Sequence, residues 1–371
     1  MKKKCAILLS RQSLHPSRST LWVRQTLKAI QWVKKNQLQI LTSIGQSTWE
    51  FIVFLAQKEQ INQIIYIPAK HSEEFDCVKN DAIQQFHLNN QCVSFIPVFP
   101  KTTTQKGIKQ LPYCRDKSLV NDAEIVIPIS IRPNGYMDQL IHLKHETFRM
   151  TQFQIRYQKR QDPIAYRVDP NHLSNHIRQL NHRYIIHWTR SSNGPWPTES
   201  KSNYYQAISQ SDDYPRQAYY SLCNILKTKV IKASCHNMPR KTPIVSFSSL
   251  HPKDAISLMR WRSRFCHMSF EPYGIGIDKE LASKINIHPV IYYEKSNRPL
   301  NSPYWLLQSR GIRSDWRVES EYRHLGDFDL NSIPWNHLIC FCYKPHEAEM
   351  ISKQFEINTV ALTSAVAPIG A

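Results

Sequence analysis

Short apolar runs alternate with amphipathic segments over the first third of the chain. Trp22, Val23, Leu27, Ile30 and Val33 recur at steps of three and four residues, which is the spacing of one face of an α-helix. The apolar runs have the length of buried strands, and those expected are Cys5–Leu9, Leu38–Leu41, Ile64–Ile67, Val93–Pro97 and Glu124–Ile129, the last reached through a polar segment over Tyr113–Ala123. Strands that alternate with helices predict a parallel sheet with right-handed crossovers, so the expected fold class is α/β with a Rossmann-like sheet.

The pattern changes after residue 133. Pro133, Asn134 and Gly135 form a turn, and the polar and basic residues that follow lose the strand–helix rhythm. Beyond it, a helix is expected over Tyr214–Lys227 and strands over Tyr184–Trp188, Pro243–Phe247, Gly274–Ile277, Val290–Tyr293 and Leu338–Phe341. The strands are too irregularly spaced for a second doubly wound sheet. We therefore expect a first domain over residues 1–150, a linker over 151–180 and a second, α+β domain over 181–371.

Glycine is scarce, and this narrows the kinds of phosphate site that the chain can build. Only 9 of 371 residues are glycine, against an ordinary share of roughly 7%. Neither a Walker A loop nor a G-x-G-x-x-G fingerprint occurs. A phosphate site here has to use single glycines and helix N-termini.

The chain is basic throughout. It carries 48 Lys and Arg against 29 Asp and Glu, a formal net charge of +19. Nucleic-acid binders usually concentrate such charge on one element, whereas here both halves share it. The densest stretch, from Arg149 through Lys159 and Arg160 to Arg167, also contains Asp162. A nucleic acid therefore stays open as a partner, beside a generally basic surface.

The cysteines and the apolar runs indicate the compartment. Nine cysteines are scattered without a C-x-x-C pair, which fits a reduced protein better than a disulfide framework. No apolar run approaches the roughly 20 residues of a membrane helix. His172 and His176 have helical spacing, but no further ligand completes a metal site. We expect a cytoplasmic protein with no membrane partner and no metal.

The loop after the second expected strand is the best phosphate-site candidate of this half. Gly45 lies between a strand and a helix, where free N–H groups and the helix dipole favour an anion. The polar residues that could join it from this loop and from neighbouring strand ends are Ser10, Arg11, Ser43, Thr48, Glu50 and Arg132. A strand–helix turn capped by Ser47, with no ligand, explains the same residues, and both interpretations stay open.

Four blocks in this half carry a family resemblance. They are Leu8–Arg11, Ser43–Glu50, Tyr113–Asp116 and Asp122–Arg132. Together they resemble SLOG-type Rossmann-like domains, the superfamily of the DNA-processing protein DprA and of lysine-decarboxylase-like nucleotide hydrolases. The resemblance implies a domain that binds a nucleotide, a nucleotide-derived signal or single-stranded DNA. The hydrolase branch carries a glycine-rich run, of which only Gly45, Thr48 and Glu50 are present here. The resemblance therefore implies binding of a ligand rather than its hydrolysis.

In the second half, three expected strand ends carry residues suited to chemistry. The first carries His187 and Arg190, the second Ser246, and the third Glu319 and Glu321. In an extended segment the two glutamates point to the same face, where each raises the pKa of the other. A same-face pair of this kind suits acid–base work or the stabilisation of positive charge. Arg190 can hold a phosphate or carboxylate through a bidentate fork.

An arginine, a Ser-x-Ser strand and a Glu-x-Glu in this order resemble the layout of ADP-ribosyltransferases. The resemblance implies that Arg190 or His187 anchors NAD, that Ser246 or Ser248 braces it, and that Glu321 stabilises an oxocarbenium-like centre. The alternative is purely structural: Glu319 forms a salt ladder with Arg317 or Arg323. Arg260-Trp261-Arg262-Ser263-Arg264-Phe265 interleaves cations with aromatic rings, as single-strand binders do, or forms an amphipathic helix.

A second resemblance covers the same half. The blocks His187–Thr189, Val245–Phe247, Tyr273–Ile277 with Pro289–Tyr292, and Trp316–Arg323 are similar to uncharacterised abortive-infection-type proteins of bacteria. This resemblance implies a setting in phage defence. The expected function is therefore a two-domain protein whose first domain binds a nucleotide or nucleotide-derived signal and whose second domain acts as effector on NAD or another nucleotide. The alternative is a non-catalytic protein that binds single-stranded nucleic acid.

Overall fold

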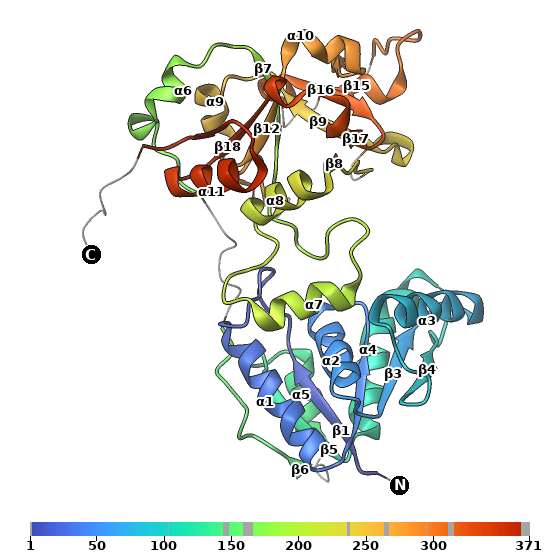
Figure 1. Ribbon diagram of the computed structural model, residues 1–371. Coiled ribbons are helices and arrows are strands. Elements are labelled where there is room, and N and C mark those ends of the chain that lie inside the picture. Colours follow the sequence, from blue (N-terminus) through green and yellow to red (C-terminus); the bar gives the residue numbers. More distant parts are fainter. Residues whose placement is uncertain are drawn as a thin grey trace. The chain divides into compact units, whose positions relative to one another are not determined.

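The chain divides into two compact units. The structure, a computed structural model, describes residues 2–102, 104–143, 148–158, 166–235, 238–262, 267–294, 296–310 and 315–364. Unit 1 comprises Met1–Pro163 with Asn193–Pro215, and unit 2 comprises Ile164–Ser192 with Arg216–Ala371 (Figure 1). Lys159, Arg160 and Asp162 of the basic stretch, and Ser263–Phe265 of the arginine–aromatic motif, lie outside the described residues.

Unit 1 is built on a parallel sheet, as its strand–helix alternation predicts. The strand order is β4-β3-β2-β1-β5-β6, and every pairing is parallel. The strands are β1 Lys4–Leu9, β2 Gln39–Ser43, β3 Gln63–Pro68, β4 Val93–Val98, β5 Ile125–Ser130 and β6 Phe148–Arg149. The central ones are apolar on both faces because helices cover both sides of the sheet. This sheet has a Rossmann-like order and confirms the expected α/β class.

The helices of unit 1 form two groups. One contains α1 Leu21–Lys35, α2 Ser47–Lys58 and α3 Ser72–Phe86, which contact one another in sequence, and the other contains α4 Gln105–Asp122 and α5 Tyr136–Leu143. Helix α4 corrects an expectation, since the polar segment over Tyr113–Ala123 is mostly its second half. Its polar composition and the internal Pro112 conceal the helical pattern.

One further helix of unit 1 comes from far along the chain. Helix α7, Lys201–Gln210, packs against α2 and α3 (Figure 1). Helix α2 is therefore covered by the sheet on one side and by α7 on the other, and Thr48 through Ala56 are all buried. This explains why its sequence is apolar on nearly all sides. The expected second domain, 181–371, thus differs from the observed unit 2, which lacks residues 193–215.

Unit 2 is built on a mixed sheet in the order β13-β16-β9-β7-β12-β18-β19. Its pairings are antiparallel except for β18 with β19. The strands are β13 His288–Pro289, β16 Glu321–Leu325, β9 Ile244–Ser248, β7 Tyr184–Trp188, β12 Gly274–Asp278, β18 Leu338–Cys342 and β19 Thr359–Ala361. This is the α+β arrangement that the irregular spacing predicts.

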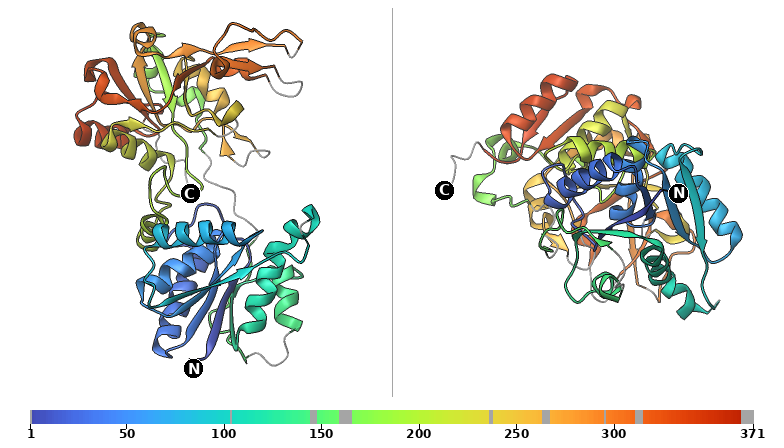
Figure 2. Two further views of the ribbon diagram at one scale, coloured as in Figure 1. Left: turned by 90° about the vertical axis from the view of Figure 1, so that its right-hand side faces the viewer. Right: turned by 90° about the horizontal axis from the view of Figure 1, so that it is seen from below.

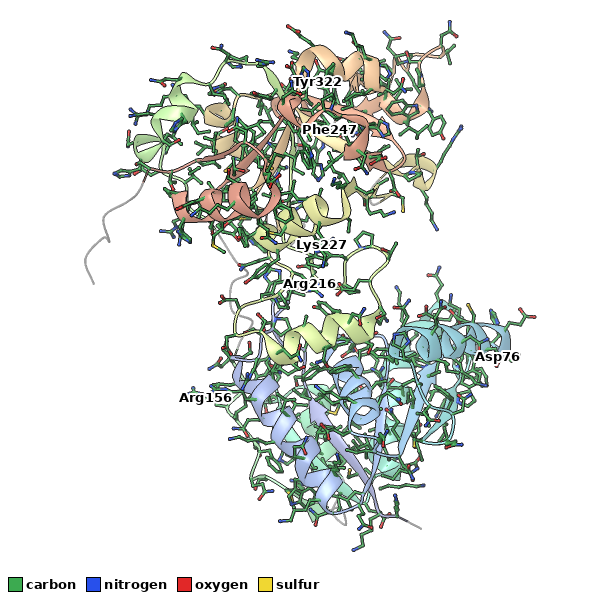
Figure 3. The ribbon with its side chains drawn as sticks, viewed as in Figure 1. Asp76, Arg156, Arg216, Lys227, Phe247 and Tyr322 are labelled. Carbon is green, nitrogen blue, oxygen red and sulfur yellow. The ribbon has the colours of Figure 1, made fainter. Side chains whose placement is uncertain are left out.

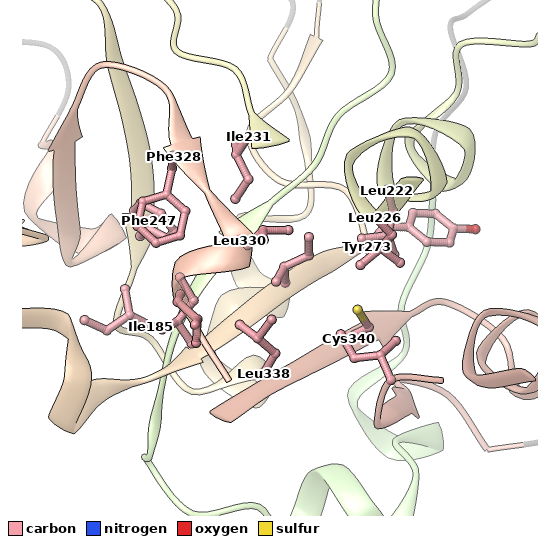
Figure 4. Packing of buried hydrophobic residues seen from close by; sticks show 14 of the residues in the cluster. Ile185, Leu222, Leu226, Ile231, Phe247, Tyr273, Phe328, Leu330, Leu338 and Cys340 are labelled. Atoms are coloured by element: carbon pink, nitrogen blue, oxygen red, sulfur yellow. The ribbon is translucent and has the colours of Figure 1, made fainter. Parts of the chain in front are cut away.

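Both faces of this sheet carry an apolar core. The first core contains Ile185, Phe247, Ile275 and Cys340, with helix α8 Ala218–Thr228 packed on it (Figure 4). The second contains Ile186, Trp188, Ile339 and Phe341, with helices α6 Asn175–Gln179 and α9 Pro252–Ala255 beside it. Because side chains alternate along a strand, odd positions of β7 and β9 face the first core and even positions face the second. Figure 3 labels Phe247 and Tyr322, a register pair on the first face.

Smaller elements complete unit 2 (Figure 2). They are the strand pairs β10 Trp261–Arg262 with β11 His267–Met268, β14 Ile291–Tyr293 with β15 Leu307–Ser309, and β8 Val230–Ile231 with β17 Phe328–Asp329, and the helices α10 Lys279–Ala282 and α11 Pro345–Phe355. Trp261 and Arg262 thus belong to a strand and not to the amphipathic helix that was the alternative interpretation. His172 ends a 3₁₀ turn before α6 begins, so His172 and His176 do not share one helix.

Within the described ranges, no helix has the length and apolarity to cross a membrane.

Candidate active site

Three neighbouring strands of unit 2 bring most of the predicted catalytic residues together. Strands β16, β9 and β7 are adjacent in the sheet, and the register pairs Arg323 with Ser246, Glu321 with Ser248, and Ser248 with Ile186. Paired residues project from the same face, so Ser246, Ser248, Glu321 and Arg323 all lie on the face of the second core. Ser246 is exposed although β9 is an inner strand, which leaves this part of the face accessible.

Glu321 is held as a fixed carboxylate. The Ser246 hydroxyl donates to its Oε1 at 2.8 Å, and Arg323 donates through Nε to Oε1 at 2.9 Å and through Nη2 to Oε2 at 3.0 Å. Arg323 is only 3% exposed and also donates to the Trp305 carbonyl and to Gln308 Oε1, each at 2.9 Å. A bidentate arginine fork whose own position is fixed holds the carboxylate in place.

Glu319 reaches the same region by a different route from the one expected. Trp316–Glu319 is a 3₁₀ helix, and Ser320 adopts a left-handed conformation with φ 44°. The prediction of an extended segment from Glu319 to Glu321 is therefore wrong, because the chain turns between the two glutamates. The side chains still interact: burial raises the pKa of Glu319 to about 7, the negative charge of Glu321 adds to this, and Arg262, Arg190 and Arg323 oppose it.

The salt ladder expected for Glu319 is also different. Glu319 pairs with Arg262, whose Nη2 lies 3.2 Å from its Oε1, and Arg317 pairs with Asp315 instead. The Arg262 guanidinium also lies 4.8 Å from the centre of the Trp316 ring and donates to the Ser269 hydroxyl. The pKa of Glu319 thus lies near neutral pH, and Arg262 is its single direct ion-pair partner among the described residues of unit 2.

Arg190 follows the end of β7 and interacts electrostatically with two carboxylates. Partial desolvation by the surrounding protein lowers the pKa of its guanidinium, and the charges of Glu271 and Glu319 oppose this. Its Nη1 is 3.3 Å from His267 Nδ1, and the side chain keeps solvent access. An exposed arginine with this freedom can still receive an anion, in contrast to Arg323.

Glu271 is a site residue that the sequence does not reveal. It is 3% exposed and accepts from the Ser191 N–H at 2.7 Å and from the Ser191 hydroxyl at 2.8 Å. Burial raises its pKa to about 7 although these bonds and Arg190 lower it. A lone glutamate before a strand has no distinguishing pattern in the sequence, and only the fold places it beside Arg190.

His187 lies apart from this cluster. Its register partner Ile275 belongs to the first core, so the imidazole projects from the opposite face to the Ser246 hydroxyl. Its Nδ1 is 2.9 Å from the backbone carbonyl of Ser246, and burial lowers its pKa to about 4. A neutral, half-buried imidazole of this kind suits a structural role between β7 and β9.

In unit 1, the predicted ligand residues lie around the carboxyl ends of β1, β2 and β5. Ser10 Oγ accepts from the Arg132 N–H at 2.9 Å, while the side chains of Arg11 and Arg132 are exposed. Ser43 donates to the Tyr66 carbonyl at 2.6 Å and accepts from Arg115 Nη1 at 3.1 Å. Thr48 is buried in the first turn of α2.

Arg115 belongs to the block Tyr113–Asp116 of the family resemblance, but it is not among the expected ligand residues. It is 2% exposed, pairs with Asp116 at 2.7 Å and donates to the Ile44 carbonyl at 3.2 Å. Among the described residues, no hydrogen-bond partner accepts from its buried Nη2. Its guanidinium lies 5.6 Å from the centre of the Trp49 ring, so a buried positive charge sits beside the first turn of α2.

The backbone N–H of Gly45 already binds a carboxylate of the protein itself, that of Glu50. Gly45 has φ 86°, a conformation that favours glycine, and its N–H donates to Glu50 Oε1 at 3.2 Å. Glu50 also accepts from Lys201 Nζ at 2.8 Å and from the Tyr205 hydroxyl at 2.9 Å. The ligand-free alternative places Ser47 as the cap of α2, whereas the N-cap is Gln46, without a side-chain bond. A phosphate at Gly45 would have to displace the Glu50 carboxylate.

Comparisons with known proteins give little beyond this geometry. No family model matches the chain, and no curated protein matches it. A solved structure that is similar is DNA processing protein A (DprA) from Streptococcus pneumoniae, at 11% identity and a TM-score of 0.26 over 38% of this chain and 47% of that one. The present chain thus spans under half of that protein, and an overlap this small carries no functional conclusion. Within the described residues, no group of three or more His, Cys, Asp or Glu side chains could hold a metal ion.

Proposed function

We propose that unit 2 binds a nucleotide such as NAD through Arg190 and cleaves the bond between nicotinamide and its ribose. The observation that carries the proposal is the carboxylate of Glu321, which Ser246 and Arg323 hold on the face of the sheet where Ser246 is exposed and where Glu319 and Arg190 interact. A carboxylate held in place is the group that stabilises an oxocarbenium-like centre.

The proposed step balances without a further cofactor. The bond between the ribose C1′ and the nicotinamide nitrogen breaks, and its electron pair leaves with nicotinamide, which becomes neutral. The cationic ribose is then captured by water, or by a nucleophile of an acceptor in the transferase version, and the nucleophile loses a proton. Glu319 is suited to take that proton, because its pKa of about 7 lies near physiological pH.

Release of nicotinamide from NAD by the full-length protein tests this proposal. Glu321→Gln keeps the shape of the side chain and removes its charge, so turnover is expected to fall by at least a hundredfold. Glu349→Gln, an exposed glutamate on α11 paired with Lys353, is the matched control and is expected to retain the parent rate. Turnover that is the same in both variants would exclude the assigned role of Glu321.

For unit 1 the proposal is that it binds a nucleotide or nucleotide-derived signal at the ends of β1, β2 and β5. Ser10, Ser43 and the buried Arg115 support it, since they place hydroxyls and a positive charge where ligands bind in open parallel sheets. Isothermal titration with ATP, ADP and NAD tests it, with Arg11→Ala and Arg132→Ala as the variants expected to weaken binding. Absence of heat with all three would contradict it for these ligands.

We place the protein in phage defence on the resemblance of its second half to abortive-infection-type proteins. Plaque formation on bacteria that express the protein tests this setting. The parent chain is expected to reduce plaque number and Glu321→Gln to restore it. Equal plaque numbers with and without the parent chain would argue against the setting, and leave the chemistry to be decided by nicotinamide release.

Binding of single-stranded nucleic acid is the alternative, and one kind of contact favours it. Cations lie over aromatic rings at Arg262 and Trp316 (4.8 Å), Arg240 and Tyr304 (4.9 Å), and Lys229 and Trp335 (5.3 Å). Such pairs offer stacking platforms beside positive charge. Affinity for a poly-dT oligonucleotide is then expected to fall steeply with salt and on Trp335→Ala, whereas a flat salt response would count against this function.

A further inference from the structure

The hairpin of β10 and β11 in unit 2 brings a second arginine close to Arg190. Arg262 and His267 are a cross-strand register pair, so their side chains project from the same face of this hairpin. Arg190 Nη1 lies 3.3 Å from His267 Nδ1. Arg190 and Arg262 therefore both lie next to one imidazole, although they are far apart in the sequence, and all three residues belong to unit 2.

The contact between Arg190 and His267 leaves the arginine able to bind an anion. His267 Nδ1 lies 2.8 Å from the Met268 carbonyl oxygen, which only accepts hydrogen bonds. This nitrogen therefore carries a proton and cannot accept from Arg190. The charges of Glu271 and Glu319 act on the guanidinium of Arg190, but no carboxylate among the described residues forms a direct ion pair with it.

Arg262 is held in place by contacts that use only part of its guanidinium. Its Nε donates to the Ser269 hydroxyl, its Nη2 donates to Glu319 Oε1 at 3.2 Å, and the group lies 4.8 Å from the centre of the Trp316 ring. A guanidinium carries five N–H donors, and Nη1 of Arg262 has no acceptor in the described part of the chain. The side chain is 18% exposed, so an anion can reach a donor that is already ordered.

The carboxylates of this region do not cancel the two positive charges at neutral pH. Burial raises the pKa of Glu271 and of Glu319 to about 7 in each case, so each is protonated in about half of the molecules near pH 7. Arginine stays charged at this pH. The region therefore has an excess of positive charge, which an anionic ligand would neutralise.

We propose that Arg190 and Arg262 together bind a diphosphate, with one arginine on each phosphate group. The Cβ atoms of a cross-strand pair are about 5 Å apart. The guanidinium of Arg262 and a guanidinium in contact with His267 are thus close enough for two linked phosphates. The diphosphate competes with Glu319 for Arg262 and so releases this carboxylate from its ion pair.

This inference rests on the proposed function and deepens it, because it names the class of substrate. A dinucleotide such as NAD carries a diphosphate, whereas nicotinamide mononucleotide carries one phosphate. The second arginine therefore selects the dinucleotide.

Isothermal titration of the full-length chain with inorganic pyrophosphate and inorganic phosphate tests the site directly. Pyrophosphate is expected to bind at least tenfold more tightly than phosphate. Arg262→Gln is expected to weaken pyrophosphate binding by about ten- to hundredfold, the effect of losing a hydrogen bond between charged groups. Arg310→Gln removes the same charge from an exposed ion pair with Glu294, and this control is expected to keep the parent affinity. Equal losses of affinity in both variants would overturn the inference.

Glu319→Gln provides a second measurement, at pH 8, where most of Glu319 is ionised. The variant keeps both arginines and removes the carboxylate that competes for Arg262, so pyrophosphate is expected to bind severalfold more tightly. It also answers the question if Arg262→Gln fails to fold. An affinity equal to that of the parent would mean that pyrophosphate does not bind at Arg262, and would overturn the inference.

Nicotinamide release separates this inference from the proposed chemistry. Pyrophosphate binding that depends on Arg262, without nicotinamide release from NAD, would support the diphosphate site and contradict NAD cleavage. Nicotinamide release with a KM for NAD that Arg262→Gln leaves unchanged would support the chemistry and contradict the diphosphate site.

Discussion

The Ser246 hydroxyl donates to Glu321 Oε1 at 2.8 Å, across two neighbouring strands and 75 positions of sequence. The bond fixes one oxygen of a carboxylate whose other oxygen is held by Arg323. Ser246→Ala removes the bond and leaves the ion pair. We expect nicotinamide release to fall about ten- to hundredfold, because a hydrogen bond to a charged group is worth roughly 1.5–3 kcal/mol. Ser257→Ala, a hydroxyl that caps a local turn, serves as control. An unchanged rate for Ser246→Ala would show that Arg323 alone positions Glu321.

Arg323→Lys tests the fork itself. Lysine keeps the charge but cannot make the bidentate contact or reach Gln308 and the Trp305 carbonyl together. The free energy of unfolding is expected to fall by about 2–4 kcal/mol in urea denaturation. Arg317→Lys is the matched control and is expected to leave stability nearly unchanged, since Arg317 and its partner Asp315 are both solvent-exposed and water screens their attraction. Similar losses of unfolding free energy in both variants would mean that the buried fork of Arg323 contributes no more to stability than the exposed ion pair of Arg317.

Stability is expected to depend on pH through Glu319. Its folded pKa of about 7 is raised from 4.5, so its stabilising contribution is complete below pH 4.5 and is lost as pH rises through 7. Glu319→Gln cannot ionise, so its stability relative to the parent is expected to improve by about 1–3 kcal/mol between pH 5 and pH 8. Urea denaturation at both pH values measures this. A difference that does not vary with pH would refute the raised pKa.

Arg115→Met probes the buried charge of unit 1. It leaves Asp116 and Ser43 without their partner, and we expect a loss of about 3 kcal/mol in the free energy of unfolding. Burial already raises the pKa of Asp116, and Arg115 opposes this. The loss is therefore expected to be larger at pH 8 than at pH 5, because only the ionised carboxylate is stranded. Lys117→Met, at an exposed position of the same helix, is expected to change stability by about 0.5 kcal/mol or less.

The sheet of unit 1 could be predicted because its pattern is local. Cys5–Leu9 and Ile64–Ile67 are apolar runs whose neighbours have helical spacing, and each needs only its own sequence to be recognised. Helix α4 could not be, since Pro112 and its many polar residues hide the period. The membership of helix α7 in unit 1 could not be predicted either, because nothing local shows where a helix docks.

The candidate site was predictable in its residue types and not in its pairings. Ser246 and Glu321 come together because β9 and β16 are neighbours, and this follows the expected order of blocks. Glu319 reaches the site through a left-handed turn at Ser320. Serine seldom adopts this conformation, so the sequence does not predict the turn. Glu271 and Arg115 are single buried charges whose importance lies in their partners. Long-range partners of this kind leave no spacing in the sequence.

The entry of α7 into unit 1 has a consequence for synthesis. Helix α2 presents Phe51 and Phe54 to Tyr205, and α3 presents Phe86 to the same ring. A ribosome makes β7 of unit 2 before it makes Tyr205. The nascent first unit therefore emerges with an aromatic surface uncovered, and it closes only when a later part of the chain has been translated. Unit 1 therefore completes its fold only after translation of unit 2 has begun.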